Sequence, residues 1–237
     1  MTTISRPKDT APDAWSVLLG CQRARSGSSR VLSALELVSS LQTLSGGQGV
    51  FELQSLEELF GFVMSAMDSA GVPYMIVGSF ASTYHGLPRS TQDLDIVCEL
   101  DVEQSEVFLE LFEAPDFYLS KPALEDAVSK RGMFNLIHIP TGWKIDFILR
   151  KNREFSRREF ARRIEVELLG KRVFMSSAED TVLAKLEWAK SSGSQRQLRD
   201  VAEILDIQGE RIDRDYIQAG LKELDLEAVM DSAKGPW

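Results

Sequence analysis

The chain has 237 residues, 43% of them hydrophobic and 27% charged, which fits a folded globular protein with a sizeable core and excludes disorder as its main state. Its formal net charge of −9 argues against a protein that adheres to nucleic acid over its whole surface. No apolar run approaches the ~18 residues of a membrane span, and residues 1–15 lack the pattern of a signal peptide, so we expect a cytoplasmic protein without a membrane partner.

The first third of the chain combines a polar arm with one amphipathic helix. Residues 1–50 are rich in Ser, Thr, Gly and Gln and contain one apolar-periodic segment, 31–44, so we expect an arm that is partly helical or flexible. The glycine-rich residues 45–49 close this arm. From Leu53 onwards, apolar residues recur at helical spacing until Gly71 and Pro73 end the pattern.

Short strands and helices then alternate. The patterns predict strands over residues 74–77 and 94–100, helices over 79–85 and 102–112, and β-hairpins over 133–149 and 164–175. From Ser176, which has capping-box spacing with Glu179, the chain is expected to be helical, with further helices near residues 198–205 and from about 213.

We therefore expect an α/β or α+β fold made of three segments. These are the arm (residues 1–50), a catalytic domain with a mixed sheet flanked by helices (residues 51–175) and a helical C-terminal subdomain (residues 176–237). Cys21 and Cys98 have no metal-type spacing, so we expect two free thiols.

Two aspartates occur one residue apart in a strand whose other residues are apolar. Strand side chains alternate, so Asp93 and Asp95 share one face, about 6.6 Å apart along the strand, while Leu94 and Ile96 share the other. Two like charges on one face need a cation, and Mg²⁺ prefers such oxygen ligands, with Mn²⁺ as an alternative. For such a pair alone, the solvent-facing side of an edge strand is an equally good interpretation.

A third carboxylate strengthens the metal interpretation. Asp146 stands between Ile145 and Phe147 in another predicted strand, as an isolated charge in an apolar alternation. Three carboxylates on adjacent strands could hold two divalent ions about 3.5–4 Å apart, the arrangement used for in-line displacement at phosphorus.

A glycine–serine turn precedes the acidic pair. Gly78 and Ser79 end one predicted strand and open a helix, where backbone N–H groups and the helix dipole favour a phosphate. We interpret this turn as the phosphate-binding half, and the carboxylates as the metal-binding half, of one site.

Together these residues resemble the motif of the nucleotidyltransferase superfamily typified by DNA polymerase β. The match consists of Val77-Gly78-Ser79, a gap of thirteen residues, Asp93-Leu94-Asp95-Ile96, and Ile145-Asp146-Phe147. The stretches 89–97 and 178–205 are similar to the AbiEii-like abortive-infection toxin branch, whose corresponding residues would be Arg89, Lys185, Arg199 and Asp200.

The resemblance implies a nucleotidyltransferase-type fold and the transfer of a nucleoside monophosphate from a nucleoside triphosphate to a hydroxyl. The acceptor would be RNA, such as tRNA, or a protein, in a toxin–antitoxin or phage-defence setting, with a cognate antitoxin as a partner. Asp93, Asp95 and Asp146 would be the catalytic and metal-binding residues. Gly78, Ser79, Arg89 and Lys185 would bind the nucleotide.

Two other functions stay open on the same residues. An aminoglycoside-type nucleotidyltransferase would use the same metal site, and the net charge of −9 allows a cationic small-molecule acceptor. A non-catalytic nucleotide-binding protein should have lost one of the three acids, and none is missing.

Several charged residues have structural interpretations of equal weight. Lys185 lies in the apolar stripe of its helix, where it needs an anion, either a triphosphate or a nearby acid such as Glu179 or Asp180. Arg89 either binds a phosphate or pairs with Asp93. Arg199 and Asp200 are expected to form a structural pair between helices.

The most basic stretch of the chain directly follows Asp146. Residues 144–163 hold eight basic and three acidic side chains. Such a run is most often a solvated helix face, but its place in the sequence also suggests a surface for the phosphates of an acceptor.

Overall fold

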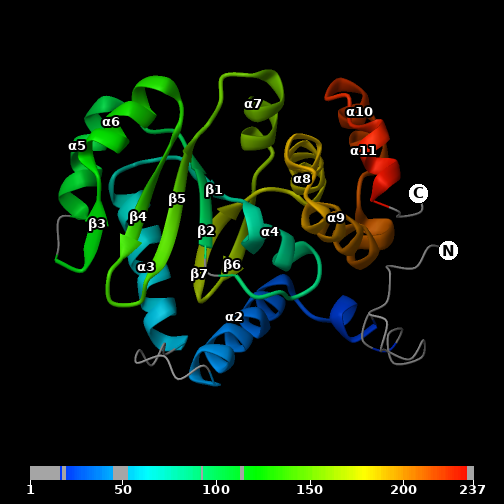
Figure 1. The fold of residues 1–237 in the computed structure, drawn as a ribbon, viewed down its shortest axis with the longest axis horizontal. Helices are drawn as coiled ribbons and strands as arrows, with labels where there is room; N and C mark the ends of the chain where they lie inside the picture. Colours follow the sequence, from blue (N-terminus) through cyan, green and yellow to red (C-terminus); the bar gives the residue numbers. More distant parts are fainter. Residues whose placement is uncertain (1–16, 18–19, 45–52, 92, 113–114, 234–237) are drawn as a thin grey trace. The chain divides into compact units, whose positions relative to one another are not determined.

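The computed structural model describes residues 17, 20–44, 53–91, 93–112 and 115–233. In this part of the chain, α-helices accompany one seven-stranded mixed β-sheet, which confirms the predicted α/β class (Figure 1). The glycine-rich end of the arm, residues 45–49, lies outside the described residues.

The chain divides into two compact units, which we call the sheet unit (residues 32–80 and 89–176) and the helical unit (residues 1–31, 81–88 and 177–237). Two helices belong partly to each unit, namely α2 (Gly27–Leu44) and α4 (Gly78–His85). The other elements of the sheet unit are α3 (Leu53–Ser69), β1 (Tyr74–Ile76), β2 (Asp93–Cys98), α5 (Val102–Leu111), β3 (Phe117–Leu119), α6 (Lys121–Lys130), β4 (Met133–His138), β5 (Trp143–Leu149), α7 (Glu154–Ala161), β6 (Ile164–Leu168) and β7 (Lys171–Met175). Those of the helical unit are α8 (Ala178–Ser192), α9 (Gln195–Gln208), η1 (Gly209–Arg211), α10 (Arg214–Glu223) and α11 (Glu227–Ser232).

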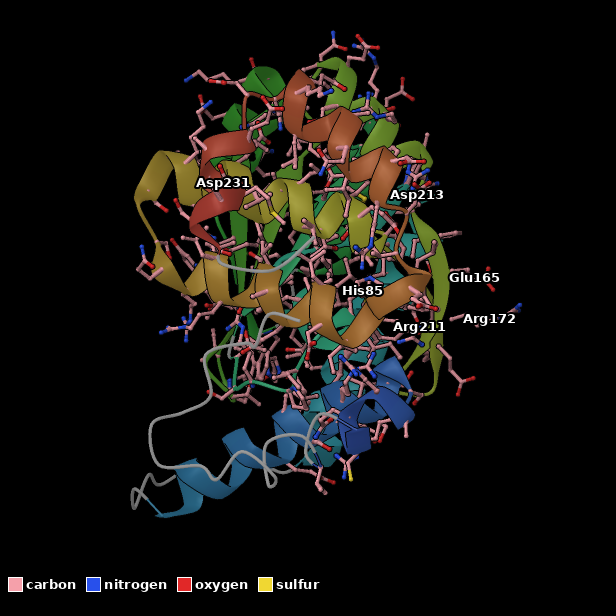
Figure 2. The ribbon with its side chains drawn as sticks, turned by 90° about the vertical axis from the view of Figure 1, so that its right-hand side faces the viewer. His85, Glu165, Arg172, Arg211, Asp213 and Asp231 are labelled. Carbon is pink, nitrogen blue, oxygen red and sulfur yellow. The ribbon has the colours of Figure 1, made fainter. Side chains whose placement is uncertain are left out.

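The sheet has the strand order β3-β4-β5-β2-β1-β7-β6. Neighbouring strands are antiparallel except β2 with β5 and β1 with β7, which are parallel. The hairpins β4–β5 and β6–β7 are the two that the sequence predicts. Strand β6 forms one edge, where Glu165 and Arg172 project from the hairpin and lie 3.6 Å apart (Figure 2). Such charged side chains discourage pairing with another sheet.

The core of the sheet unit lies against the apolar face of its central strands. Leu94 and Ile96 of β2 are buried, and so are Phe134 of β4 and Phe147 of β5. Phe108 of α5 contacts both aromatic rings, with centroid distances of 5.8 and 5.0 Å. Edge-to-face packing of this kind fixes the helix against the sheet and leaves the opposite face of β2 and β5 for polar side chains.

Helix α3 buries the stripe that the sequence predicts. The positions of this stripe have at most 6% exposure, namely Leu56, Leu59, Phe60, Val63, Met64 and Met67. The helix ends before Gly71, whose φ of +61° reverses the chain toward β1.

Strand β3 and helix α6 have no counterpart among the predictions. Strand β3 is only three residues long, and α6 is a polar helix whose start depends on the cap Ser120, which accepts a bond from the N–H of Ala123. Neither segment carries a long apolar period, so tertiary pairing with β4 defines them.

The start of α8 corrects another prediction. The cap is Ser177, which accepts from the N–H of Asp180, and not Ser176 with Glu179. Ser176 instead extends β7, because its N–H donates to the carbonyl of Ile76 at 3.0 Å. Pairing with β1 thus shifts the helix start by one residue.

Both cysteines are free thiols, as predicted, with Cys21 exposed and Cys98 buried. Among the described helices, none combines the length and apolarity needed to cross a lipid bilayer.

Candidate active site

The Gly78-Ser79 turn lies directly against the acidic strand β2. The N–H of Val77 donates to the carbonyl of Asp95 at 2.9 Å, and Gly78 has a φ of +63°. A Cβ atom at position 78 would lie 1.9 Å from Oδ2 of Asp95. Only glycine therefore allows this turn and this carboxylate to occupy the same place.

The side chain of Ser79 ties the turn to the beginning of β2. Its hydroxyl lies 2.6 Å from the hydroxyl of Thr91 and donates to the carbonyl of Asp93 at 3.3 Å. The hydroxyl of Thr91 also donates to the carbonyl of Asp93, at 3.2 Å. The segment between the turn and the acidic pair thus brings Thr91 back beside Ser79.

The register of β2 and β5 places Asp146 beside the acidic pair. Asp95 is the Cα partner of Asp146, and Asp93 is the partner of Lys144. Because side chains alternate along a strand, all four share the polar face of the sheet. The structure therefore brings together five of the predicted site residues, which are Gly78, Ser79, Asp93, Asp95 and Asp146.

Asp146 is held by two residues that the sequence interpretation did not include in the site. Asn135, its Cα partner on β4, donates its amide N–H to Oδ1 of Asp146. The ammonium of Lys144 lies 2.9 Å from Oδ2. Asp146 itself is only 8% exposed. The position of Lys144 two residues before an acid in the same strand could have suggested this contact.

The pKa of Lys144 indicates that all three carboxylates interact with its ammonium group. The hydrogen bond to Asp146 raises the pKa of Lys144 above its ordinary value, burial opposes this, and the charges of Asp146, Asp93 and Asp95 raise it further. All three acids thus stabilise a single positive charge on the polar face.

The donor set of this cluster suits a hard cation, although its present arrangement is not that of a complete ligand set. Within residues 17–233, gaps apart, no three His, Cys, Asp or Glu side chains are close enough together to hold one metal ion. Mg²⁺ commonly takes only one or two carboxylates and completes its shell with water and substrate phosphates. The paired Asp95 and Asp146 provide such carboxylate oxygens, and Lys144 already shows that the face accepts a cation.

The two other predicted nucleotide-binding residues belong to other segments of the chain. Arg89 is half-buried in the segment that joins α4 to β2. Lys185 belongs to the helical unit, where its ammonium donates to Asp200 at 2.6 Å and to the amide oxygen of Gln197 at 2.9 Å. Its side chain is 6% exposed and that of Asp200 is 4% exposed.

This pairing differs from both predictions made for the acids near Lys185. The anion comes from α9 and not from Glu179 or Asp180 of the lysine's own helix, because α8 and α9 pack side by side. Asp200 thus pairs with Lys185, whereas its neighbour Arg199 is exposed. Asp180 instead accepts from Ser177 at 2.8 Å.

The histidines occupy structural positions. His85 ends α4 and is buried; it is labelled in Figure 2. His138 ends β4, where its Nδ1 lies 2.7 Å from the hydroxyl of Thr141. Burial lowers the pKa of His138, with Asp116 opposing the shift, so it is neutral near pH 7.

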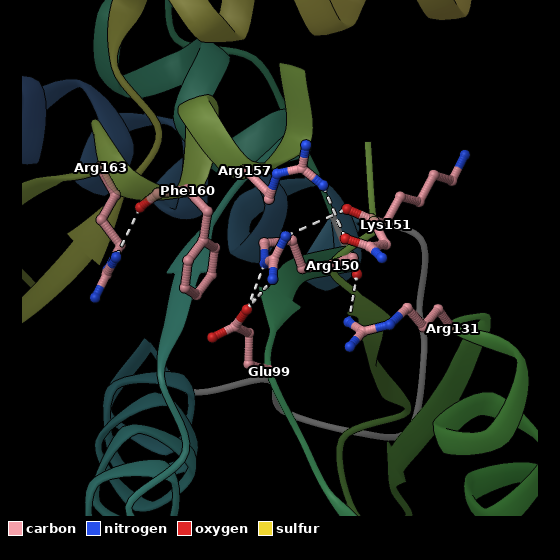
Figure 3. Close-up of polar contacts among 8 residues, drawn as sticks. Glu99, Arg131, Arg150, Lys151, Arg157, Phe160 and Arg163 are labelled. Atoms are coloured by element: carbon pink, nitrogen blue, oxygen red, sulfur yellow. Dashed lines mark hydrogen bonds and ion pairs between the residues drawn. The ribbon is translucent and has the colours of Figure 1, made fainter. Parts of the chain in front are cut away.

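The basic stretch forms helix α7 and the segment before it. Phe155 and Phe160 of α7 are buried, whereas Arg157 and Arg162 are exposed, as expected for an amphipathic helix. At the end of β5, four cations gather in what we call the basic cluster: Arg131, Arg150, Lys151 and Arg157 (Figure 3).

Contacts within the basic cluster are mostly with uncharged oxygens. Arg150 is paired with the carboxylate of Glu99. Arg131 instead donates to the carbonyl of Arg150 at 2.9 Å, and Arg157 donates to the amide oxygen of Asn152 at 2.8 Å. Arg150 follows Asp146 by four residues, which is about 13 Å in an extended chain. The basic cluster therefore begins about 13 Å from the carboxylate of β5.

Comparison with known proteins supports the fold. No family model matches the chain, and no curated protein matches it in sequence. Among solved structures, the antibiotic-resistance factor ANT(2'')-Ia in complex with adenylyl-2''-tobramycin is 12% identical, with a TM-score of 0.50 over 72% of this chain and 97% of its own. An antigenic nucleotidyltransferase-like protein from Paracoccidioides brasiliensis is 18% identical, with a TM-score of 0.48 over 78% and 95% of the two chains. The chain therefore has the fold of nucleotidyltransferases.

Proposed function

We propose that the protein is a divalent-metal-dependent nucleotidyltransferase that moves a nucleoside monophosphate from a nucleoside triphosphate to a hydroxyl acceptor. One observation carries this proposal: Gly78 lets a strand-to-helix turn, of the kind that binds phosphate, lie against Asp95, and the sheet register places Asp95 beside Asp146. A solvent-facing acidic strand would need neither the glycine nor the third acid.

Each site residue has a role in this reaction. The backbone N–H groups at the start of α4, with Gly78 and Ser79, would bind the triphosphate. Asp93, Asp95 and Asp146 would hold Mg²⁺, or Mn²⁺, in two positions. Bound Mg²⁺ would polarise the reacting phosphate, lower the pKa of the acceptor hydroxyl and stabilise the leaving pyrophosphate. Asp146, held by Asn135, would orient the acceptor hydroxyl and receive its proton.

Residues outside this cluster would complete the nucleotide site. Arg89 would contact a phosphate from the segment before β2. Lys185 is neutralised by Asp200 within its own unit, so its proposed contact with the nucleotide is not needed to explain its burial.

For the acceptor we favour an RNA hydroxyl. The basic cluster is the supporting observation, because the chain as a whole is acidic and yet gathers four cations at the end of β5, the strand that carries Asp146. Positive side chains at one or two nucleotide spacings from the reacting hydroxyl would bind the phosphates of the strand. A protein hydroxyl in a toxin–antitoxin or phage-defence setting, with a cognate antitoxin, has support only from the sequence resemblance.

A small cationic acceptor is the second candidate. The similarity of fold to ANT(2'')-Ia, whose solved complex holds adenylyl-2''-tobramycin, favours this alternative. The net charge of −9 would also suit a cationic substrate.

Label transfer tests the function and separates the acceptors. The purified protein is incubated with Mg²⁺ and each α-phosphate-labelled nucleoside triphosphate, together with total RNA, protein extract or an aminoglycoside. We expect label on RNA with wild type, none with Asp95→Asn, and wild-type transfer with Asp126→Asn, an exposed acid of the same unit. Equal transfer by wild type and Asp95→Asn would reject the site. Label on the aminoglycoside alone would establish the second candidate.

A further inference from the structure

Both oxygens of the Asp146 carboxylate have partners within the chain. Asn135 donates to Oδ1, and the ammonium of Lys144 lies 2.9 Å from Oδ2. The amide of Asn135 is neutral and would stay compatible with a bound cation. Lys144 is not, because its positive charge lies at the oxygen that a metal would use.

Lys144 is placed to act on more than one acid. It is the Cα partner of Asp93, it stands two residues before Asp146, and it shares their face of the sheet. Its side chain is 42% exposed, so the flexible stem can move the ammonium away without unfolding anything around it.

We propose that Lys144 is a positioning residue that serves as an internal counter-ion of the carboxylate cluster, holds Asp146 in place before a divalent metal binds, and competes with that metal. This inference rests on the proposed metal site. It assigns to Lys144 a role in metal affinity that an ordinary surface ion pair would not have.

Competition predicts the direction and the size of the change in metal affinity when Lys144 loses its charge. Divalent metal must displace the ammonium or share the carboxylates with it, so removing the charge should tighten metal binding. Because Lys144 is partly exposed, water screens the interaction, and the expected change is about three- to tenfold in dissociation constant.

The test measures Mn²⁺ binding to the protein without nucleotide, by titration with electron paramagnetic resonance detection of unbound Mn²⁺. Lys144→Met keeps most of the side-chain length and removes the charge, whereas Lys144→Arg keeps the charge. Lys130→Met is the matched control, since Lys130 also pairs with an aspartate of the same unit, Asp126, at 2.5 Å, and both side chains are exposed. Asp146→Asn reports on the site itself.

We expect Lys144→Met to bind Mn²⁺ more tightly than wild type, with Lys144→Arg and Lys130→Met close to wild type and Asp146→Asn much weaker. Equal affinities of wild type and Lys144→Met would overturn the role of Lys144 while leaving the metal site standing. Equal tightening by Lys130→Met would reduce the effect to net charge and would also overturn it. Absence of Mn²⁺ binding in wild type and Lys144→Met alike would overturn the competition, because no metal would then reach the nucleotide-free carboxylates for Lys144 to oppose. Thermal unfolding of each variant checks that the fold is intact.

Discussion

At the scale of single residues, Gly78 meets two requirements at once. Its φ of +63° is in the left-handed region, and Oδ2 of Asp95 occupies the place of a Cβ atom. Gly78→Ala should therefore cost the left-handed penalty of about 1–2 kcal/mol and in addition push the Asp95 carboxylate away. We expect a loss of more than about 2 kcal/mol in the free energy of unfolding, measured by urea denaturation, and loss of nucleotidyl transfer.

Gly142 provides the matched control for this prediction. It lies in the same unit with a φ of +69°, and nothing is within 4 Å of a Cβ built there. Gly142→Ala should lower the free energy of unfolding only by the left-handed backbone penalty and leave nucleotidyl transfer intact. If the two variants lose equal stability and equal activity, the contact between position 78 and Asp95 has no role in the site.

The two cysteines should differ sharply in reactivity. Burial raises the pKa of the Cys98 thiol to about 12, with the charge of Glu99 adding to the shift, whereas Cys21 is exposed. Thiolate is the reacting form, so at pH 8 only Cys21 should react with a chromogenic disulfide, and both should react in denaturant. Cys21→Ser should then show no reactive thiol in the native protein. Rapid modification of Cys98 in that variant would contradict its burial.

At the scale of elements, the central part of the fold could be predicted because its signals are local. The alternation in β2 and β5, the turn at Gly78 and the stripe of α3 each follow from residues close together in the sequence. These signals sufficed to predict that Asp93, Asp95 and Asp146 lie on adjacent strands, as the register of β2 and β5 shows. What they could not give is the full strand order of the sheet.

The remaining parts depend on contacts between distant residues. Asn135 becomes a partner of Asp146 only through the β4–β5 register, and Asp200 becomes the partner of Lys185 only through helix packing. Strand β3 has three residues, too few for a period. Tertiary pairing decides these features, and no local pattern carries it.

The buried pair between α8 and α9 should contribute strongly to the helical unit. Lys185→Met leaves Asp200 buried without its cation, and Asp200→Asn leaves the cation without its anion. Each should lower the free energy of unfolding by about 3–5 kcal/mol, while the double variant Lys185→Met/Asp200→Leu should cost much less than the two single changes together. Urea denaturation followed by circular dichroism measures this.

Lys190→Met is the control for the buried pair, because Lys190 lies on the same helix as Lys185, α8, and pairs with an exposed aspartate, Asp225. It should change stability little. A double variant as unstable as the sum of its single changes would show that the pair is not coupled. A raised KM for the nucleotide in a folded double variant would favour the proposed contact of Lys185 with substrate.

At the scale of the whole molecule, charge is distributed unevenly. The chain carries −9 overall, yet the basic cluster gathers four cations in one region of the sheet unit. An acidic protein with one basic region can bind a polyanion locally without general adhesion to nucleic acid. If RNA is the acceptor, Arg131→Gln with Arg157→Gln should reduce transfer to RNA several-fold and flatten its salt dependence, with transfer to a small acceptor unchanged.

Stability at high pH should be limited by buried groups in the centre of the sheet. Burial raises the pKa of Tyr74, on β1, to about 12, and the charge of Asp68 adds to the shift. In the unfolded chain tyrosine loses its proton near pH 10, so between about pH 10 and 12 the folded state keeps a proton that the unfolded state has lost. The free energy of unfolding must then fall as pH rises, by about 2–3 kcal/mol from this group.

Tyr74→Phe should remove that part of the slope, whereas Tyr118→Phe, at an exposed site, should follow wild type. Urea denaturation at a series of pH values from 8 to 12 measures the slopes, and equal slopes for all three proteins would mean that Tyr74 titrates alike in the folded and unfolded states.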